Sequence, residues 1–230
     1  MEHRRRLLRE ILVIFSLYLL PSLVLPTGLP VVVIDLRSLI LTTARNLVFS
    51  LLIVYLADLR GERALLTGLS PVSRTSPSGA IVLAGLVATI LFLLSLLVGA
   101  VAARFSAEIP GVGAVLPALA ERHPTVIWLP VVVIAMAGVG LAEELLFRAY
   151  LIHRFRQLEL SRSTAVVLAA GLFAIGHGYQ GIAAIVFAFL AGIGLGALWL
   201  RRPRLLPFAV GHGIYNLVVL LISSAGTAIF

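Results

Sequence analysis

The strongest constraint on the fold of this chain is a succession of apolar segments long enough to cross a lipid bilayer. A transmembrane helix needs about 20 predominantly apolar residues. The segments that approach this length are Ile11–Leu25, Leu39–Ala57, Ala80–Ala102, Val126–Phe147, Thr164–His177, Ile182–Leu200 and Leu206–Ile222. The sequence therefore predicts an all-α, polytopic membrane bundle of about seven transmembrane helices.

The composition supports a membrane protein and excludes several other classes. The chain is 60% hydrophobic and 12% charged, whereas a soluble domain averages about 45–50% apolar and about 25% charged residues. Because the chain has no cysteine, disulfides and thiolate metal sites are excluded. Its net charge of +8 comes from arginine alone, and we attribute it to loops at the membrane surface rather than to nucleic-acid binding.

The placement of the arginines predicts the orientation of the bundle, because cytoplasmic loops are enriched in basic residues. One side of the expected membrane holds Arg4, Arg5, Arg6, Arg9, Arg60, Arg63, Arg74, Arg154, Arg156, Arg162, Arg201, Arg202 and Arg204. The opposite side holds Arg104 and Arg122, with Arg37 near the start of the second segment. We therefore expect a cytoplasmic N-terminus. The basic, then apolar, N-terminus also resembles a signal peptide, but it lacks a small-x-small cleavage site, which favours a retained first helix.

Several polar residues lie within the apolar segments, where an ionisable group costs about 2.5–3.5 kcal/mol and marks a pathway or a site. They are Arg45, Asn46, Glu143, Glu144, Arg148, His177, His212 and Asn216. Arg45 and Asn46 either line the same cavity as the others or point outward, and the sequence does not separate these alternatives. The remaining six are the candidate site residues.

Depth and spacing bring these six residues toward one point. Glu143 and His177 both lie about 20 Å above the turn that joins their segments, if both segments are helical. Glu144 and Arg148 are four residues apart and are expected to pair on one helix face. The same spacing places the ring of Phe173 beside the imidazole of His177. We expect a polar cavity that opens toward the cytoplasm.

A carboxylate and a histidine can activate water for attack on a carbonyl group. A second histidine with an asparagine can donate hydrogen bonds to the developing oxyanion. His212 and Asn216, four residues apart on the last segment, suit this second role. The set indicates hydrolysis without a serine or cysteine nucleophile.

Three short motifs also resemble a known family. "EELLFR" fits E-E-x-x-x-R, "FAIGH" fits F-x-x-x-H and "HGIYN" fits H-x-x-x-N, in this order along the chain. Together they are similar to the CPBP (Abi) intramembrane proteases, which include type II CAAX prenyl endopeptidases and bacteriocin-processing enzymes. The resemblance covers a helical core over residues 126–222, preceded by three helices and their loops in residues 1–125, within a single membrane domain.

The resemblance implies a role for each site residue. Glu143 is the general base with His177, Glu144 and Arg148 support that pair, and His212 and Asn216 form the oxyanion hole. The family is often described as metalloproteases, but the chain has no H-E-x-x-H motif, so we expect no required cofactor. If a divalent metal such as zinc binds, its ligands are Glu143, His177 and His212.

The resulting hypothesis is an intramembrane endopeptidase of a prokaryotic plasma membrane that hydrolyses a membrane-associated, prenylated or bacteriocin-like peptide. Its partners are that peptide or lipidated protein and the lipid bilayer, with no nucleic acid. A proton-coupled transporter is one alternative, although the sequence contains no inverted repeat. A non-catalytic immunity or scaffold protein with the same fold is the other.

Overall fold

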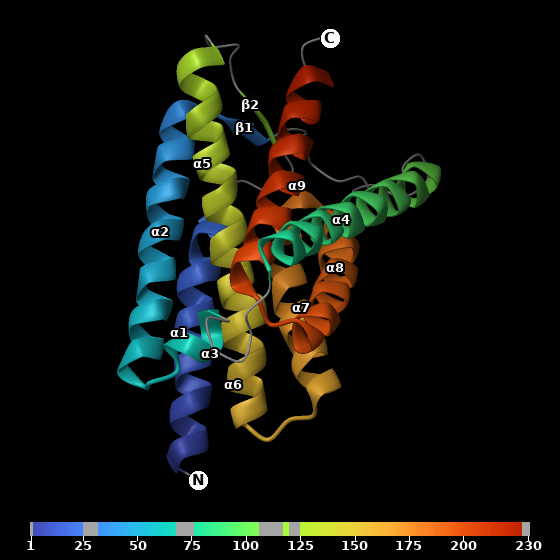
Figure 1. The fold of residues 1–230 in the computed structure, drawn as a ribbon. Helices are drawn as coiled ribbons and strands as arrows, with labels where there is room; N and C mark the ends of the chain where they lie inside the picture. The colour runs from blue at the N-terminus through green and yellow to red at the C-terminus, as the bar shows by residue number, and fades with distance from the viewer. Residues whose placement is uncertain (1, 25–31, 68–75, 106–116, 120–124, 227–230) are drawn as a thin grey trace. The chain divides into compact units, whose positions relative to one another are not determined.

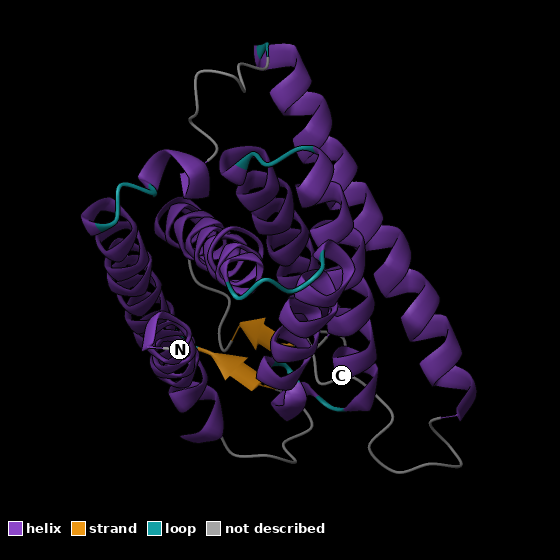
Figure 2. Cartoon of the chain, turned by 90° about the horizontal axis from the view of Figure 1, so that it is seen from below, coloured by secondary structure: helices purple, strands orange, loops and turns teal. Residues whose placement is uncertain are grey.

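The computed structural model describes residues 2–24, 32–67, 76–105, 117–119 and 125–226, and helices make up most of them (Figure 2). The α-helices are α1 (Glu2–Val24), α2 (Leu36–Leu59), α3 (Arg63–Thr67), α4 (Pro77–Phe105), α5 (Thr125–Glu143), α6 (Ile152–Gln157), α7 (Arg162–Gly176), α8 (Ile182–Arg201) and α9 (Leu205–Gly226). A π-helix, η2 (Glu144–Leu151), joins α5 to α6, and a 3₁₀ turn, η3 (Gly178–Gln180), joins α7 to α8. Two short parallel strands, β1 (Val32–Ile34) and β2 (Pro117–Leu119), pair with each other.

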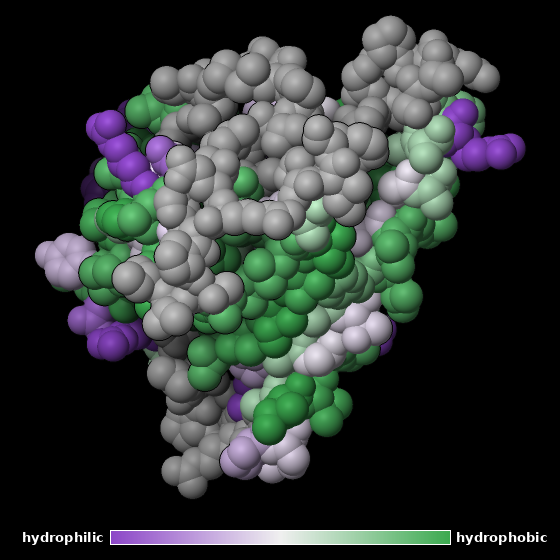
Figure 3. Space-filling model, turned by 90° about the horizontal axis from the view of Figure 1, so that it is seen from above, coloured by the Kyte–Doolittle hydropathy of each residue, from purple (hydrophilic) through white to green (hydrophobic). Residues whose placement is uncertain are grey.

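Five helical segments are long and apolar enough to cross a membrane. They are Leu36–Leu59, Pro77–Phe105, Trp128–Gln157, Ile182–Arg201 and Leu205–Ala225. The other two expected segments are also helical, because α1 has 23 residues and α7 has 15. Hydrophobic residues dominate the described surface visible in Figure 3, as expected for helices that face lipid. The chain is an integral membrane protein with a polytopic helical bundle, and the all-α class is confirmed apart from the two three-residue strands.

The contacts divide the chain into two compact units, each built from three stretches. Unit 1 contains Met1–Leu29, Leu94–Ala114 and Phe147–Pro203, and unit 2 contains Pro30–Leu93, Val115–Leu146 and Arg204–Phe230. The division passes through η2, between Leu146 and Phe147, and also through α4. This division differs from the expected boundary after residue 125, between the first three helices and the family core. That boundary stays a prediction.

Unit 1 is held together by antiparallel helices that approach closely. Figure 1 shows α7 and α8 side by side. A Cβ atom added at Gly192 would lie 2.7 Å from the Ala170 Cβ, and one at Gly196 would lie 2.8 Å from the Val166 Cγ1. Small residues at such positions let membrane helices pack against each other.

Unit 2 is built on α2, α5 and α9, which run alongside one another in Figure 1. Its buried apolar cluster consists of Leu39, Val132, Ala135, Met136 and Leu220. β1 and β2 pack at one edge of this cluster through Ile34 and Leu119. The Leu119 amide donates to the Ser224 Oγ of α9 at 3.0 Å, which ties the small sheet to the last helix.

Candidate active site

Two adjacent glutamates and one histidine form a buried polar cluster in unit 2. Glu143 is the last residue of α5, and Glu144 is the first residue of η2. The His212 Nδ1 lies 2.7 Å from the Glu144 Oε1, and the His212 Nε2 lies 3.5 Å from the Glu143 Oε2. Glu144 is 0% exposed and His212 is 4% exposed. One imidazole therefore connects both carboxylates.

The cluster constrains where protons can sit. If Glu144 is ionised, its carboxylate only accepts hydrogen bonds, and the His212 Nδ1–H then donates to it. The Nε2 then faces Glu143 either as an acceptor from a protonated carboxyl or as the second donor of an imidazolium. Both arrangements place a mobile proton between Glu143 and His212, which is the requirement for acid–base work on water.

Close helix approach places His212 beside the glutamates. A Cβ atom added at Gly140 of α5 would lie 2.7 Å from the Ala209 carbonyl oxygen and 2.8 Å from the Gly213 nitrogen. On the other side of His212, a Cβ atom at Gly211 would clash with the Ala84 carbonyl oxygen of α4. The glycines before and after His212 therefore let α9 contact the backbones of two helices. This contact sets the depth of the imidazole relative to α5.

The helix that carries the glutamates changes its hydrogen-bond pattern at this cluster. Residues Glu144–Leu151 form a π-helix, in which each amide bonds to the carbonyl five residues earlier rather than four. Side chains four residues apart then no longer lie directly above one another. The expected Glu144–Arg148 pair rests on α-helical spacing and stays a prediction, while the Glu144 carboxylate contacts the His212 Nδ1. Short π-helical segments occur often at functional sites.

Arg148 and His177 lie in unit 1, where they share the ring of Phe173. The Arg148 guanidinium carbon lies 4.5 Å from the centre of the Phe173 ring, and Arg148 is 1% exposed. The rings of Phe173 and His177 are 4.5 Å apart between centroids and 68° apart in orientation. The predicted contact of Phe173 with the imidazole is confirmed.

The tautomer of His177 follows from its hydrogen bond. Its Nδ1 lies 2.9 Å from the Phe173 carbonyl oxygen. Because a carbonyl can only accept, the Nδ1 carries the proton. In the neutral ring the Nε2 is then an acceptor. His177 is half-buried at the end of α7, so this nitrogen is suited to receive a proton or to bind water.

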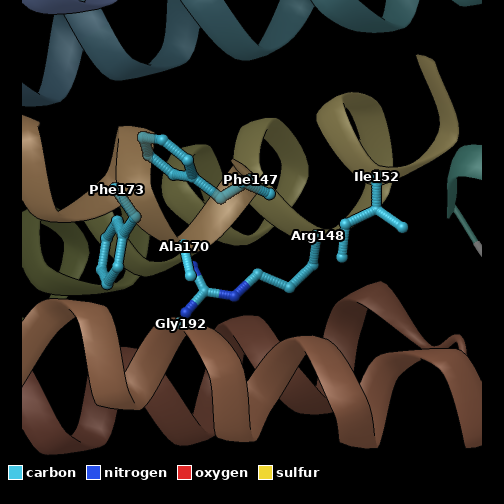
Figure 4. Close-up of a pocket in the computed structure, with 7 residues that line it drawn as sticks. Phe147, Arg148, Ile152, Ala170, Phe173 and Gly192 are labelled. Carbon is cyan, nitrogen blue, oxygen red and sulfur yellow. The ribbon is translucent and has the colours of Figure 1, made fainter. Parts of the chain in front are cut away.

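A narrow recess in unit 1 surrounds the Arg148 side chain, which reaches toward the helices of Ala170 and Gly192 (Figure 4). It is lined by Phe147, Arg148, Ile152, Ala169, Ala170, Phe173 and Gly192. All of its walls except Arg148 are apolar. The guanidinium therefore sits in a low-dielectric environment, where its attraction to an aromatic face is strengthened.

The six candidate residues thus divide between the two units. Unit 2 contains Glu143, Glu144, His212 and Asn216, and unit 1 contains Arg148 and His177. Asn216 is half-buried and lies one turn after His212 on α9. The convergence of the two groups, and the pairing of Glu143 with His177, stay predictions. The sequence predicted an oxyanion-hole role for His212 but not its hydrogen bond with Glu144 or its contact with Glu143.

The structure separates the two polar residues of α2. Asn46 is 4% exposed, whereas Arg45 is exposed and donates from its Nη2 to the Asn46 Oδ1 at 3.3 Å. Arg45 therefore points outward and Asn46 is buried, and a cavity shared by Asn46 with the other polar residues stays a prediction.

The donors in unit 2 do not fit a metal ion. Metal ligands converge on one point at about 2.0–2.2 Å, but the two carboxylates contact opposite nitrogens of the His212 ring. Within the described residues, no group of three or more histidine, aspartate or glutamate side chains is arranged to hold a metal.

Comparison with known proteins gives one match. Residues 124–218 match the family model described as type II CAAX prenyl endopeptidase Rce1-like. No curated protein and no solved structure matches the chain. The matched range contains the glutamates at the α5–η2 junction, the His177 region and the His212 helix. The similarity of this chain to the type II CAAX prenyl endopeptidase Rce1-like family therefore extends over residues 124–218.

Proposed function

We propose that the protein is an intramembrane endopeptidase that hydrolyses a peptide bond with water activated by Glu143. The observation that carries this proposal is the buried Glu143–His212–Glu144 cluster within the range that matches the endopeptidase family. A buried cluster of ionisable side chains is expensive to maintain inside a membrane protein. The presence of this cluster therefore supports a catalytic role more than a role in helix packing.

In the proposed reaction, the ionised Glu143 removes a proton from water as the water oxygen attacks the peptide carbonyl carbon. The carbonyl π-electrons move to oxygen, and the resulting oxyanion accepts hydrogen bonds from His212 and Asn216. The tetrahedral intermediate then collapses and breaks the C–N bond. The leaving amine receives the proton held by Glu143, so no oxidant, reductant or further reactant is needed.

The other residues orient these groups. Glu144 accepts from the His212 Nδ1–H, which fixes the ring and directs the Nε2 toward Glu143. His177, with its Nε2 as acceptor, accepts a hydrogen bond from the attacking water while Glu143 removes the water's other proton. Arg148 positions Phe173 through its guanidinium–ring contact. General-base catalysis contributes about 10²–10⁴-fold, and one oxyanion donor contributes about 10²–10³-fold.

The proposed substrate is a peptide or lipidated protein that reaches the enzyme within or at the surface of the membrane. The apolar exterior of the bundle supports this route, because a substrate with a hydrophobic anchor is concentrated in the same phase. Prenylated CAAX proteins and bacteriocin-like peptides are the two substrate classes to test first. We place the protein in a prokaryotic plasma membrane with its site open to the cytoplasm.

The test compares the full chain with Glu143→Gln in two assays. The first follows cleavage of a farnesylated CAAX peptide by the purified proteins, and the second compares peptides in membranes that contain either form. Glu159→Gln is the matched control, because Glu159 is an exposed glutamate in the loop after α6. We expect one processing event to disappear in Glu143→Gln and to persist in Glu159→Gln. Processing that survives in both Glu143→Gln and His212→Ala would overturn the proposal, and substrate-dependent proton flux without cleavage would favour a transporter.

A further inference from the structure

One end of unit 1 carries a dense group of exposed arginines, which we call the basic end. It consists of Arg4, Arg5, Arg6, Arg9, Arg156, Arg162, Arg201 and Arg202, all exposed. These residues come from the start of α1, the end of α6, the start of α7 and the end of α8. None of these arginines is among the proposed catalytic residues.

Contacts within unit 1 explain why the start of α1 lies at this end. Tyr18 packs its ring edge on Phe147, with centroids 5.2 Å apart. Eight residues earlier on α1, the Glu10 Oε1 accepts from the Arg154 Nε at 3.1 Å and from the Tyr150 hydroxyl at 2.8 Å. The numbering rises on one element as it falls on the other, so α1 is antiparallel to η2 and α6. The first turns of α1 therefore lie level with the end of α6.

The contacts of α7 and α8 bring the remaining arginines to the same end. Gly192 faces Ala170, and Gly196 faces Val166, so these helices are also antiparallel. Extending this register places the end of α8 level with the start of α7, which follows α6 after a short turn. Arg201 and Arg202 therefore lie near the level of Arg162.

Few acidic residues balance this charge. The described acids of unit 1 are Glu2, Glu10 and Glu159. Glu2 forms an ion pair with Arg6, and Glu10 pairs with the buried Arg154. Glu159 is exposed in the loop after α6. The basic end therefore carries a large positive excess.

The surface directly beyond the arginines is apolar, and it belongs to the same helices. On α1 the exposed side chains include Leu8, Leu12, Leu17 and Leu20. Exposed apolar residues continue on α7 and α8, namely Val167, Leu168, Ile175, Ile182, Val186 and Leu190. From Arg4 to Leu20 the rise along α1 is about 24 Å, which is close to the thickness of a bilayer core at about 30 Å.

We propose that the basic end binds the headgroups of anionic phospholipids whose acyl chains lie along the apolar sides of α1, α7 and α8. A guanidinium binds phosphate oxygens in a bidentate manner, and clusters of arginine beside a membrane helix recognise anionic lipids. An acidic protein or nucleic acid would match the charge but not the apolar surface that adjoins it. The proposal is independent of the proposed peptidase activity.

The experiment reconstitutes the purified full chain in nanodiscs that contain phosphatidylcholine and phosphatidylglycerol. Spin-labelled lipids of each class report the selectivity of the protein-bound lipid shell. Arg4→Gln/Arg5→Gln/Arg9→Gln removes three charges from the basic end and leaves the Arg6–Glu2 pair in place. The matched control, Arg37→Gln/Arg60→Gln/Arg63→Gln, removes three exposed arginines from unit 2.

We expect the wild type to prefer phosphatidylglycerol, and the basic-end variant to lose about tenfold of this preference. The control variant should retain it, and added salt should weaken it in the wild type. An unchanged preference in the basic-end variant would overturn the proposal, as would an equal loss in the control. Binding of a poly-glutamate peptide without lipid selectivity would assign the basic end to an acidic protein partner instead. Because the substituted side chains are exposed, unchanged melting temperatures show that both variants fold.

Discussion

The two histidines of the proposed site are held in different ways in the two units. His212 in unit 2 lies between two carboxylates and is almost completely buried. His177 in unit 1 is half-buried, and its Nδ1 donates to a backbone carbonyl while an aromatic ring covers one face. The first arrangement suits a ring that donates hydrogen bonds, and the second leaves a nitrogen that accepts one. Two imidazoles with the same intrinsic chemistry can thus serve opposite roles.

Replacing each histidine by alanine should separate these roles, and it is the change with the largest expected effect. Both variants should lose about 100-fold or more in peptide cleavage. His212→Ala should also lower the free energy of unfolding by about 1–3 kcal/mol, because the buried Glu144 carboxylate loses its imidazole donor. His177→Ala removes only a local bond to a carbonyl, so its melting temperature should change little. Equal loss of stability in both variants would contradict the comparison.

The buried ion pair of unit 1 offers the next largest effect. Arg154→Ala should destabilise the protein by about 3–5 kcal/mol, since removing one partner of a buried pair leaves the other without its counter-charge. Arg154 is 0% exposed and bonds Glu10 of α1. The control is Arg156→Ala, two residues away and exposed. Thermal unfolding in detergent measures both, and a similar melting temperature for the two variants would show that the pair does not hold α1.

Glycine substitutions test whether close packing matters equally in both units. Gly140→Ala in unit 2 and Gly192→Ala in unit 1 should each cost about 1–3 kcal/mol, because the new methyl group meets neighbouring atoms at 2.7 Å. Gly138→Ala and Gly194→Ala are matched controls, since a Cβ atom at either position has no neighbour within 4 Å. Only Gly140→Ala should also reduce cleavage, because it displaces α9 beside His212. If Gly140→Ala is destabilised but retains cleavage, the close packing at Gly140 does not control the position of the catalytic residues.

The smallest effect concerns the start of α2 in unit 2. The Asp35 side chain accepts from the Ser38 amide at 2.7 Å, and this bond lowers the pKa of Asp35 below its usual 3.8. A lowered pKa means that the stabilisation is present above that usual value and is lost as the pH falls through the lowered one. Hydrogen exchange of the Ser38 amide, corrected for its intrinsic rate, should therefore speed up only in that acidic range. In Asp35→Asn the protection should not depend on pH.

Apolar length and local spacing made much of the fold predictable. The helices followed from runs of apolar residues, and the contact of Phe173 with His177 followed from four-residue spacing in a regular α-helix. Polar residues within apolar runs also identified Glu143, Glu144 and His212, because burial of such groups needs partners.

Features that depend on tertiary packing were not predictable. The π-helix at Glu144–Leu151 has no marker in its sequence, whereas the expected pairing of Glu144 with Arg148 assumed α-helical spacing. The contact of His212 with both glutamates depends on how closely α9 approaches α5. The Glu10–Arg154 pair had a usable signal in the four-residue spacing of Tyr150 and Arg154. The pair was not predicted, because Glu10 lies outside the first apolar segment, which begins at Ile11.

The close approach of three helices around His212 also limits how this protein can change through evolution. Gly140 and Gly211 face backbone atoms of neighbouring helices. Because a substitution shortens side chains and not the backbone, no substitution on the neighbouring helix can make room for a new Cβ atom. A descendant could replace either glycine only if two helices moved apart together, which one substitution does not achieve. Gly138 and Gly194 face open space and are free to vary. We therefore expect substitutions to accumulate at positions such as Gly138 and Gly194, while the helix spacing that places His212 beside Glu144 is retained.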